Sequence, residues 1–256
     1  MDSFGAAISV RDLTKRYRQV TAVNGLTFDV APGTTTALLG GNGAGKTTTI
    51  SILLGVLLPT GGAVSVLGED MLRHRYRVLP RMNFSSPYVD LPRRLTVKEN
   101  LRVYGRLYAI RNMRARIGDL AESLDLTQLL NRPFGNLSSG QKTRVALAKS
   151  LLNEPEVLLL DEPTASLDPD TADWIRTFLK DYQQRTRATF LLASHNMAEV
   201  ERVCDDVIML RTGTVVDRGT PRALIDKYGR QNLEEVFLDI ARGRDDTVTA
   251  GAEAAQ

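Results

Sequence analysis

The chain has 256 residues, of which 43% are hydrophobic and 25% are charged, a composition typical of a globular protein with a sizeable core. Its longest apolar stretches, such as residues 50–58, fall far short of the roughly 18 consecutive apolar residues that a membrane-spanning helix needs. The formal net charge of +3 is mild: it is compatible with nucleic acid or anionic lipid as a partner, but the favoured interpretation is that it reflects neither.

The N-terminus and the cysteine content bear on the compartment. Residues 1–10 lack the basic start, the long apolar run and the small-residue cleavage site of a secretory signal, so we expect the chain to stay in the cytoplasm. The single cysteine, Cys204, has no partner for an internal disulfide and no companion metal ligands. We interpret it as a structural thiol in a reducing compartment.

The first predicted elements are strands. Short β-rich segments occur at residues 8–10 and 26–30, and a turn at Pro32-Gly33 leads into an apolar strand over 34–39. That strand runs directly into a glycine-rich segment, and a helical pattern follows over 46–58. The order strand, glycine-rich loop, helix is the context that a phosphate-binding loop requires.

Residues 40–47 have the sequence GGNGAGKT, which fits the phosphate-loop pattern G-x-x-x-x-G-K-S/T. Glycines let backbone N–H groups close around a β-phosphate, and the positive end of the following helix dipole points at the same anion. We expect Lys46 to bridge the β- and γ-phosphates as a catalytic residue and Thr47 to place its hydroxyl on Mg²⁺. An ordinary glycine-rich turn is the alternative, which this context disfavours. The residues expected to bind the nucleotide here are Gly40, Asn42, Gly43, Ala44, Gly45, Lys46, Thr47 and Thr48.

The middle of the chain changes character. A cluster of basic side chains is interpreted as a solvated face; its members are Arg73, His74, Arg75, Arg77, Arg81, Arg93 and Arg94. From about residue 87 to 133, apolar residues recur at helical spacing, with Val97, Leu101 and Tyr104 in one set and Ile117 and Leu120 in another. This stretch is predicted to form an all-helical insertion and a second lobe.

Helices and strands alternate again after the insertion. We predict a helix from Gln141, then a strand at 157–160, a helix at 169–184, a strand at 189–193, a helix at 197–203 and a strand at 207–210. This alternation predicts a mainly parallel sheet covered by helices. The final residues, 242–256, are small and polar and are predicted to be disordered.

Two carboxylates follow the apolar strand at 157–160. Asp161 and Glu162 stand where a central strand delivers side chains to the edge of a site, and Pro163 ends the strand. Asp161 is expected to hold Mg²⁺ through its water shell, and Glu162 to polarise the attacking water. An isolated Asp-Glu pair is more often a solvated turn, but a preceding phosphate loop and buried strand favour the site.

Residues 137–141 have the sequence LSSGQ, followed by Pro155 and by the strand that ends in the two carboxylates. Read from the residues alone, Ser138 to Gly140 cap a helix that starts near Gln141 and leave N–H groups and a hydroxyl for an anion. In this order and spacing the segment resembles the signature region of ABC ATPases, and the resemblance covers nearly all of residues 8–243.

The resemblance implies an α/β fold: a P-loop NTPase of ABC type, with a mainly parallel sheet core, an antiparallel β subdomain and an inserted helical subdomain. It places one ATPase domain at residues 1–240, the helical subdomain at about 88–140 and a disordered tail at 241–256.

It also implies site residues. Ser138 and Gly140 would bind the γ-phosphate held by a second copy, and residues 166–168 would couple the two sites across the interface. His195 is similar to the switch histidine that contacts the γ-phosphate, and Tyr17 stands where the family places an aromatic that stacks on adenine. An ordinary surface histidine and a plain strand aromatic are the respective alternatives.

The function that the resemblance implies is ATP binding and hydrolysis, with Mg²⁺, that energises transport. The implied partners are transmembrane permease subunits and a second ATPase copy in a homodimer, with no nucleic acid, at the cytoplasmic face of the inner membrane. Residues 233–238 resemble the ending of ATPases that serve ABC-2 exporters of drugs, lipids or polysaccharides, which favours export. The alternatives are a soluble ABC-type ATPase acting on ribosomes or DNA, whose usual second ATPase unit or long coiled coil is missing, and a degenerate scaffold without turnover.

Three positions depart from the family pattern. Gly41 replaces a proline of the phosphate loop, and Ser139 replaces the first of two signature glycines. Pro87 falls where the family carries a glutamine that senses Mg²⁺ and the transmembrane partner. Because the proline side chain offers neither a donor nor an acceptor, we expect its contribution to the metal site to be lost and hydrolysis to be slower or differently gated.

Overall fold

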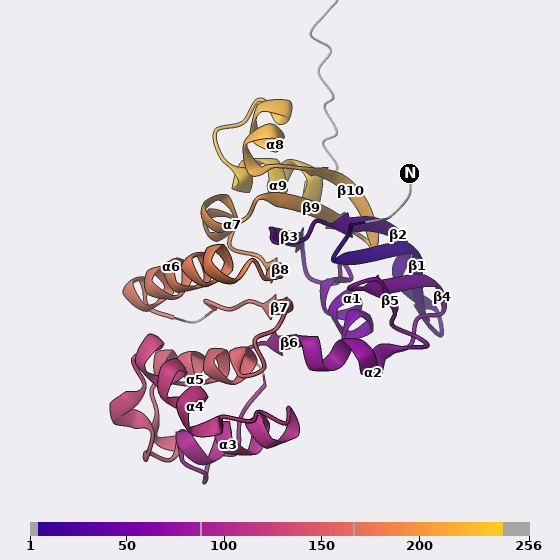
Figure 1. Ribbon diagram of the computed structural model, residues 1–256. Helices are drawn as coiled ribbons and strands as arrows, with labels where there is room; N and C mark the ends of the chain where they lie inside the picture. The colour runs from indigo at the N-terminus through magenta and orange to yellow at the C-terminus, as the bar shows by residue number, and fades with distance from the viewer. Residues whose placement is uncertain (1–4, 88, 166, 243–256) are drawn as a thin grey trace, which may run out of the picture.

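The computed structural model describes residues 5–87, 89–165 and 167–242, and it contains two β-sheets with helices packed around them (Figure 1). The larger sheet has six strands in the order β10-β9-β3-β8-β7-β6. All neighbouring pairs are parallel except β9 and β10, which confirms the predicted mainly parallel core. Its strands are β3 (Thr35–Gly40), β6 (Met82–Ser85), β7 (Val157–Asp161), β8 (Thr189–Ser194), β9 (Asp206–Arg211) and β10 (Thr214–Gly219).

The smaller sheet is antiparallel, in the order β2-β1-β4-β5. Its strands are β1 (Ile8–Tyr17), β2 (Val20–Val30), β4 (Gly61–Val66) and β5 (Glu69–Asp70). The strands predicted at 8–10 and 26–30 were too short, because their far halves are largely exposed and polar and so carry little apolar signal. Backbone pairing between β1 and β2 extends them, through several register shifts, to the turn between Tyr17 and Val20.

Helices surround both sheets. They are α1 (Lys46–Leu53), α2 (Arg75–Val78), α3 (Val97–Leu107), α4 (Met113–Ser123), α5 (Ser139–Leu151), α6 (Pro169–Thr186), α7 (Met197–Val203), α8 (Pro221–Tyr228) and α9 (Leu233–Arg242). Helix α2 contacts β5 of the smaller sheet, and α3 and α4 contact each other and α5. The helix predicted over 46–58 ends at Leu53, since Gly55 adopts a left-handed conformation (φ 67°) that breaks the helix. Helices α3, α4 and α5 gather on one side of the molecule, away from the antiparallel sheet (Figure 1).

Both faces of the larger sheet are buried. Leu158 and Leu160 of β7 pack into one apolar cluster with the helices, whereas Val157 and Leu159 pack into a second cluster with α1 and the antiparallel sheet. Successive strand residues point to opposite faces, so a strand covered on both sides must be apolar throughout. This accounts for the uninterrupted apolar run that the sequence shows at 157–160.

The remaining expectations concern the ends of the chain and single residues. Helix α9 includes Ala241 and Arg242, while the rest of the predicted disordered tail, 243–256, lies outside the described residues.

Cys204 is buried, and burial raises the pKa of its thiol well above the ordinary value, which fits a structural role. Of the helices in the described ranges, none has the length and apolar composition required to cross a membrane.

Candidate nucleotide-binding and hydrolysis site

A cavity of about 1000 Å³ lies at the carboxyl ends of β3, β7 and β8. The carboxyl ends of parallel strands meet at one edge of a sheet, where ligands of open α/β folds bind. The cavity brings together seven of the residues predicted from the sequence, namely Gly40, Asn42, Lys46, Thr47, Asp161, Glu162 and His195.

The phosphate loop depends on glycine geometry. Gly45 adopts φ 98° and lies so close to the antiparallel sheet that a Cβ there would stand 2.6 Å from the Ala22 carbonyl oxygen. Gly45 is also the N-cap of α1 and supplies no side-chain cap, so the first N–H groups of the helix remain open to an anion. Residues 43–45 and Thr48 belong to the loop and the start of α1 without lining the cavity themselves.

The Lys46 ammonium lies in the mouth of this loop. It donates hydrogen bonds to the carbonyl oxygens of Gly40 and, at 3.3 Å, of Gly41. Burial lowers the pKa of Lys46, and the carboxylates of Glu162 and Asp161 partly oppose that shift. The amine is thus placed to exchange the loop carbonyls for phosphate oxygens.

Glu162 and His195 form a close pair in the cavity wall. The His195 Nδ1 atom lies 2.6 Å from Glu162 Oε1, and the His195 backbone N–H donates to Glu162 Oε2 at 3.4 Å. The Glu162 side chain is only 11% exposed, whereas the His195 side chain is 69% exposed. Glu162 also holds a left-handed backbone conformation (φ 50°), which is unfavourable for a residue with a Cβ and typical of functional sites. The pair fits the roles of water activation and γ-phosphate contact.

Asp161 is the carboxylate available to a cation. Burial is the main cause that raises its pKa and Glu162 adds to the effect, while a hydrogen bond from Ser86 and the charge of Lys46 lower it. No cluster of three metal-ligating His, Cys, Asp or Glu side chains occurs within the described ranges. One carboxylate with the Thr47 and Ser86 hydroxyls nevertheless fits Mg²⁺, which commonly takes one or two protein carboxylates together with substrate phosphates and water.

Ser86 is a cavity residue that the sequence analysis missed. Its hydroxyl lies 3.4 Å from Asp161 Oδ2, and the side chain is 5% exposed. The neighbouring Pro87 does not line this cavity; it lines small adjoining hollows beside Thr143 and Ala146 of α5. The one available signal was strand pairing, because β6 runs parallel to β7 with Ser85 opposite Leu160, which brings the next residues, Ser86 and Asp161, together.

The sequence analysis also missed a group of residues that contacts the chain segments next to Glu162 and His195. Glu199, on α7, is 2% exposed, and its carboxylate accepts hydrogen bonds from the hydroxyls of Thr164 and Ser194, each at 2.9 Å. No pattern in the sequence singles out these residues, because an acidic residue in the first turn of a helix is commonplace.

The signature segment lies elsewhere in the same chain. Ser138 is the N-cap of α5, where its hydroxyl accepts from the Gln141 N–H at 3.3 Å and its own N–H donates to Gln141 Oε1 at 3.1 Å. Ser138 and Gly140 line a separate hollow of about 420 Å³, which shares no residue with the nucleotide cavity. A single chain therefore does not bring the signature segment to its own phosphate loop.

Two other predicted positions also lie away from the cavity. Tyr17, at the end of β1, is 46% exposed, and the Lys15 ammonium stands 5.1 Å from its ring centroid. Within the predicted coupling loop at 166–168, residue 166 lies outside the described residues, while Asp168 caps α6 by accepting from the Thr171 N–H at 2.9 Å. Asp168 lines the signature hollow as well.

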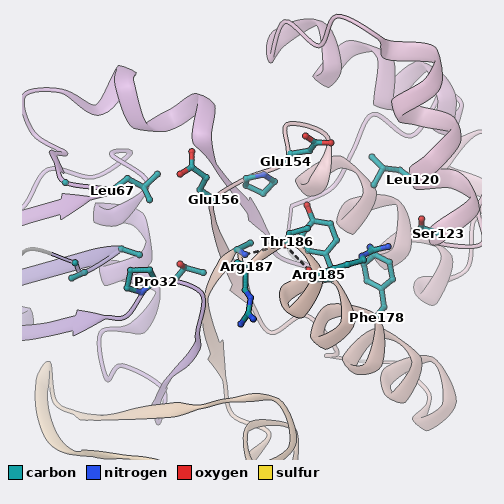
Figure 2. A pocket seen from close by; sticks show the side chains of 18 of the residues that line it. Pro32, Leu67, Leu120, Ser123, Glu154, Glu156, Phe178, Arg185, Thr186 and Arg187 are labelled. Atoms are coloured by element: carbon teal, nitrogen blue, oxygen red, sulfur yellow. Dashed lines mark hydrogen bonds between the residues drawn. The ribbon is translucent and has the colours of Figure 1, made fainter.

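The molecule has another large cavity, of about 1100 Å³, near the amino ends of β7 and β8 (Figure 2). Pro32 and Leu67 face it from one side and Phe178 from the other, and none of the predicted site residues lines it. Two of its carboxylates are already paired, Glu154 with Arg116 at 3.1 Å and Glu156 with Arg81 at 2.6 Å. The cavity at the carboxyl ends of the strands, which the predicted residues do line, is therefore the candidate nucleotide site.

Known proteins resemble this chain over almost its whole length. The profile of the family described as ABC transporter matches residues 23–165, more than half of the chain. Nod factor export ATP-binding protein I of Ralstonia nicotianae is 37% identical over 234 residues, which is 91% of this chain and 73% of that protein. The ABC transporter ATP-binding protein NatA of Bacillus subtilis is 33% identical over 244 residues, or 92% and 99% of the two chains.

Solved structures agree with the sequence comparison. A structure described as the ATP binding subunit of an ABC transporter superposes with a TM-score of 0.83 at 27% identity, covering 91% of this chain and 99% of the other. Both ends of the phosphate loop, the two carboxylates and the histidine line one cavity, an arrangement that fits ATP hydrolysis. The chain belongs to the ABC transporter family, in which it is an ATP-binding subunit that hydrolyses ATP.

Proposed function

We propose that two copies of this chain close head to tail around two ATP molecules, and that this cycle drives export through membrane-spanning permease subunits at the cytoplasmic face of the inner membrane. The observation that carries the dimer is the separation of the signature hollow from the nucleotide cavity within one chain. A second copy is then needed to complete each site, with Ser138 and Gly140 reaching the γ-phosphate in trans.

Each residue of the closed site has a defined role in this proposal. The phosphate-loop N–H groups and Lys46 hold the β- and γ-phosphates, and the ring of Tyr17 lies against adenine. Glu162 accepts a proton from the attacking water, while His195 fixes the orientation of that carboxylate and faces the γ-phosphate. Thr47 and Asp161 would hold Mg²⁺, which neutralises charge on the β- and γ-phosphates when it is bound.

Export is supported by the relatives rather than by the site. The similar protein of Ralstonia nicotianae is described as a Nod factor export ATP-binding protein, and it aligns with 91% of this chain. The last described helix, α9, which includes the exporter-like segment at 233–238, packs Leu233, Val236 and Ile240 into the main core. The relatives disfavour the alternative of a soluble ATPase acting on ribosomes or DNA, since they are transporter proteins.

The experiment that tests the proposal uses Glu162→Gln, which keeps the shape of the side chain and removes its basicity. We expect turnover to fall by at least about 100-fold, the usual contribution of a general base. ATP should convert this variant from monomer to a stable dimer in gel filtration, whereas ADP should not. Turnover close to that of the wild type would remove Glu162 from the role of base.

The trapped dimer also identifies the partners. Tagged Glu162→Gln protein is recovered with ATP from detergent-solubilised membranes, and co-purifying proteins are identified by mass spectrometry. Co-purification of a multispanning membrane protein in the presence of ATP, but not in its absence, would support the permease assignment. Ribosomal or DNA-repair proteins in its place would contradict it.

A further inference from the structure

Glu199 is a buried carboxyl group that the proposed hydrolysis does not use. It lies in the first turn of α7 and is 2% exposed. Burial disfavours its charged form and raises its pKa, and nearby Glu162 acts in the same direction. A buried carboxyl destabilises the fold unless hydrogen bonds compensate for its lost hydration. Both of its oxygens have such partners.

The two partners come from the two segments that carry the hydrolytic pair. Thr164 donates its hydroxyl proton to Glu199 Oε1 at 2.9 Å, and it lies two residues after Glu162. Ser194 donates to Glu199 Oε2 at 2.9 Å, and it directly precedes His195. One carboxylate thus ties the loop after β7 to the end of β8, and both hydrogen bonds are buried.

The hydroxyl of Ser194 stands between two carboxylates. Its oxygen lies 2.9 Å from Glu199 Oε2 but 3.5 Å from Glu162 Oε2, and it accepts the Asn196 N–H at 3.0 Å. A serine hydroxyl has a single proton to donate. The shorter contact makes Glu199 the main acceptor of that proton, so Ser194 offers Glu162 only a long, weak hydrogen bond, and the Glu162 carboxylate remains open to His195 and to a water molecule.

Helix α7 fixes the position of Glu199 itself. The Asn196 side chain caps α7 by accepting the Glu199 N–H at 3.1 Å, while the Asn196 N–H is the group that donates to Ser194. The side chain of Glu199 therefore projects from a capped first turn rather than from a mobile loop. Small displacements of this carboxylate would pass directly to Ser194 and Thr164.

We propose that Glu199 is a positioning residue for ATP hydrolysis, which holds Thr164 and Ser194, thereby fixes the Glu162–His195 pair and remains the main acceptor of the Ser194 proton. This inference rests on the proposed roles of Glu162 and His195. Glu199 does not line the nucleotide cavity, so it acts on the reaction through the two hydroxyls.

The test is steady-state ATP hydrolysis by Glu199→Gln. An amide offers one acceptor oxygen in place of two, so it cannot accept from Thr164 and Ser194 together, and the link between their two segments is broken. We expect kcat to fall about ten-fold, because misplacement of a reacting group is costly, while KM for ATP stays within about two-fold. Glu201→Gln is the control two residues further along α7: its amide oxygen can still accept the Leu233 N–H that Glu201 accepts, and the variant should match the wild type.

Two further measurements distinguish a positioning role of Glu199 in hydrolysis from a role in the stability of the fold. The melting temperature of Glu199→Gln should fall by only a few degrees, because one buried hydroxyl loses its acceptor, and kcat should fall at temperatures where the variant is fully folded. Ser194→Ala should lower kcat to a similar extent, and the double variant should lose no more than either single one, since both changes remove the same link. The alanine variant also keeps the inference testable if Glu199→Gln does not fold.

The outcomes also distinguish this inference from the proposed function. If Glu162→Gln abolishes turnover but Glu199→Gln retains the wild-type kcat, the inference is wrong and the proposed function stands. If Glu162→Gln itself retains turnover, the proposed hydrolytic pair is wrong. A loss that is fully additive in the double variant would also overturn the inference, because the two residues would then act independently.

Discussion

At the scale of single residues, the loop after β6 lacks the family's glutamine side chain but places a serine hydroxyl in the nucleotide cavity. Pro87 stands where the family carries a glutamine, and its ring can neither donate nor accept a hydrogen bond. Ser86, one residue earlier, is buried beside Asp161 and lines the nucleotide cavity. The oxygen that this loop offers to the site therefore comes from a serine hydroxyl.

This arrangement predicts the effect of Ser86→Ala. If the hydroxyl supports Mg²⁺ at Asp161, the Mg²⁺ concentration needed for half-maximal nucleotide binding should rise about three-fold, the size expected for one hydrogen-bonding group. Titration of a fluorescent ATP analogue at graded Mg²⁺ measures this directly, without turnover. Ser85→Ala is the matched control, since Ser85 is as small and buried but does not line the cavity. Equal Mg²⁺ dependence in both variants would exclude Ser86 from the metal site.

At the scale of secondary-structure elements, Lys149 connects the signature helix to the strand that leads to Pro87. From α5 its ammonium donates to Asn83 Oδ1 at 3.2 Å and to the Phe84 carbonyl oxygen at 3.0 Å, both on β6. It also stands 5.5 Å from the ring centroid of Tyr104 on α3. A single half-buried amine thus links two helices of the helical lobe to the edge strand of the main sheet.

The burial of Lys149 predicts a pH dependence of stability. Burial lowers the pKa of this amine from 10.5 to about 8 in the folded protein. Between these values the unfolded chain binds more protons than the folded one, so the free energy of unfolding should rise as the pH increases. Relative to Lys149→Met, the wild type should gain about 2 kcal/mol between pH 7 and pH 10.

Denaturant unfolding at the two pH values measures this difference. Lys180, which is exposed on α6, provides the control, and Lys180→Met should follow the wild-type pH curve. Parallel curves for the wild type and Lys149→Met would show that the Lys149 amine titrates alike in the folded and unfolded chains.

At the scale of the whole molecule, the division of the site between two copies has a consequence for mixed dimers. Lys46→Ala disables the phosphate loop, and Ser138→Asp keeps an effective N-cap on α5 while placing a negative charge against the γ-phosphate. Each variant alone should be inactive. In a dimer of one copy of each, one site contains both changes and the other contains neither.

An equal mixture of these two variants should therefore regain activity. Random pairing makes half of the dimers mixed, each with one intact site, so roughly a quarter of the wild-type turnover is expected if one site suffices. ATPase assays of the separate and mixed proteins measure the recovery. Mixtures as inactive as their components would contradict a site shared in trans.

The sequence determined those parts of the site that are contiguous in the chain. The phosphate loop, the Asp161-Glu162 pair and the capped signature segment are each encoded within a few residues, because backbone conformation and capping depend on near neighbours. The uninterrupted apolar strands likewise predicted a sheet buried on both faces. Family membership followed from the order and spacing of these local segments.

The tertiary structure alone decided which distant residues meet. Ser86 reaches Asp161 across 75 positions of sequence and Thr164 reaches Glu199 across 35, and no local pattern records either contact. The ends of α1 and of the antiparallel strands were also mispredicted, since backbone pairing and a left-handed glycine override apolar periodicity there. Parallel pairing of β6, β7 and β8 aligns the carboxyl ends of these strands, and that alignment, rather than any neighbour in the chain, brings together Ser86, Asp161 and the segments that carry Thr164 and Glu199.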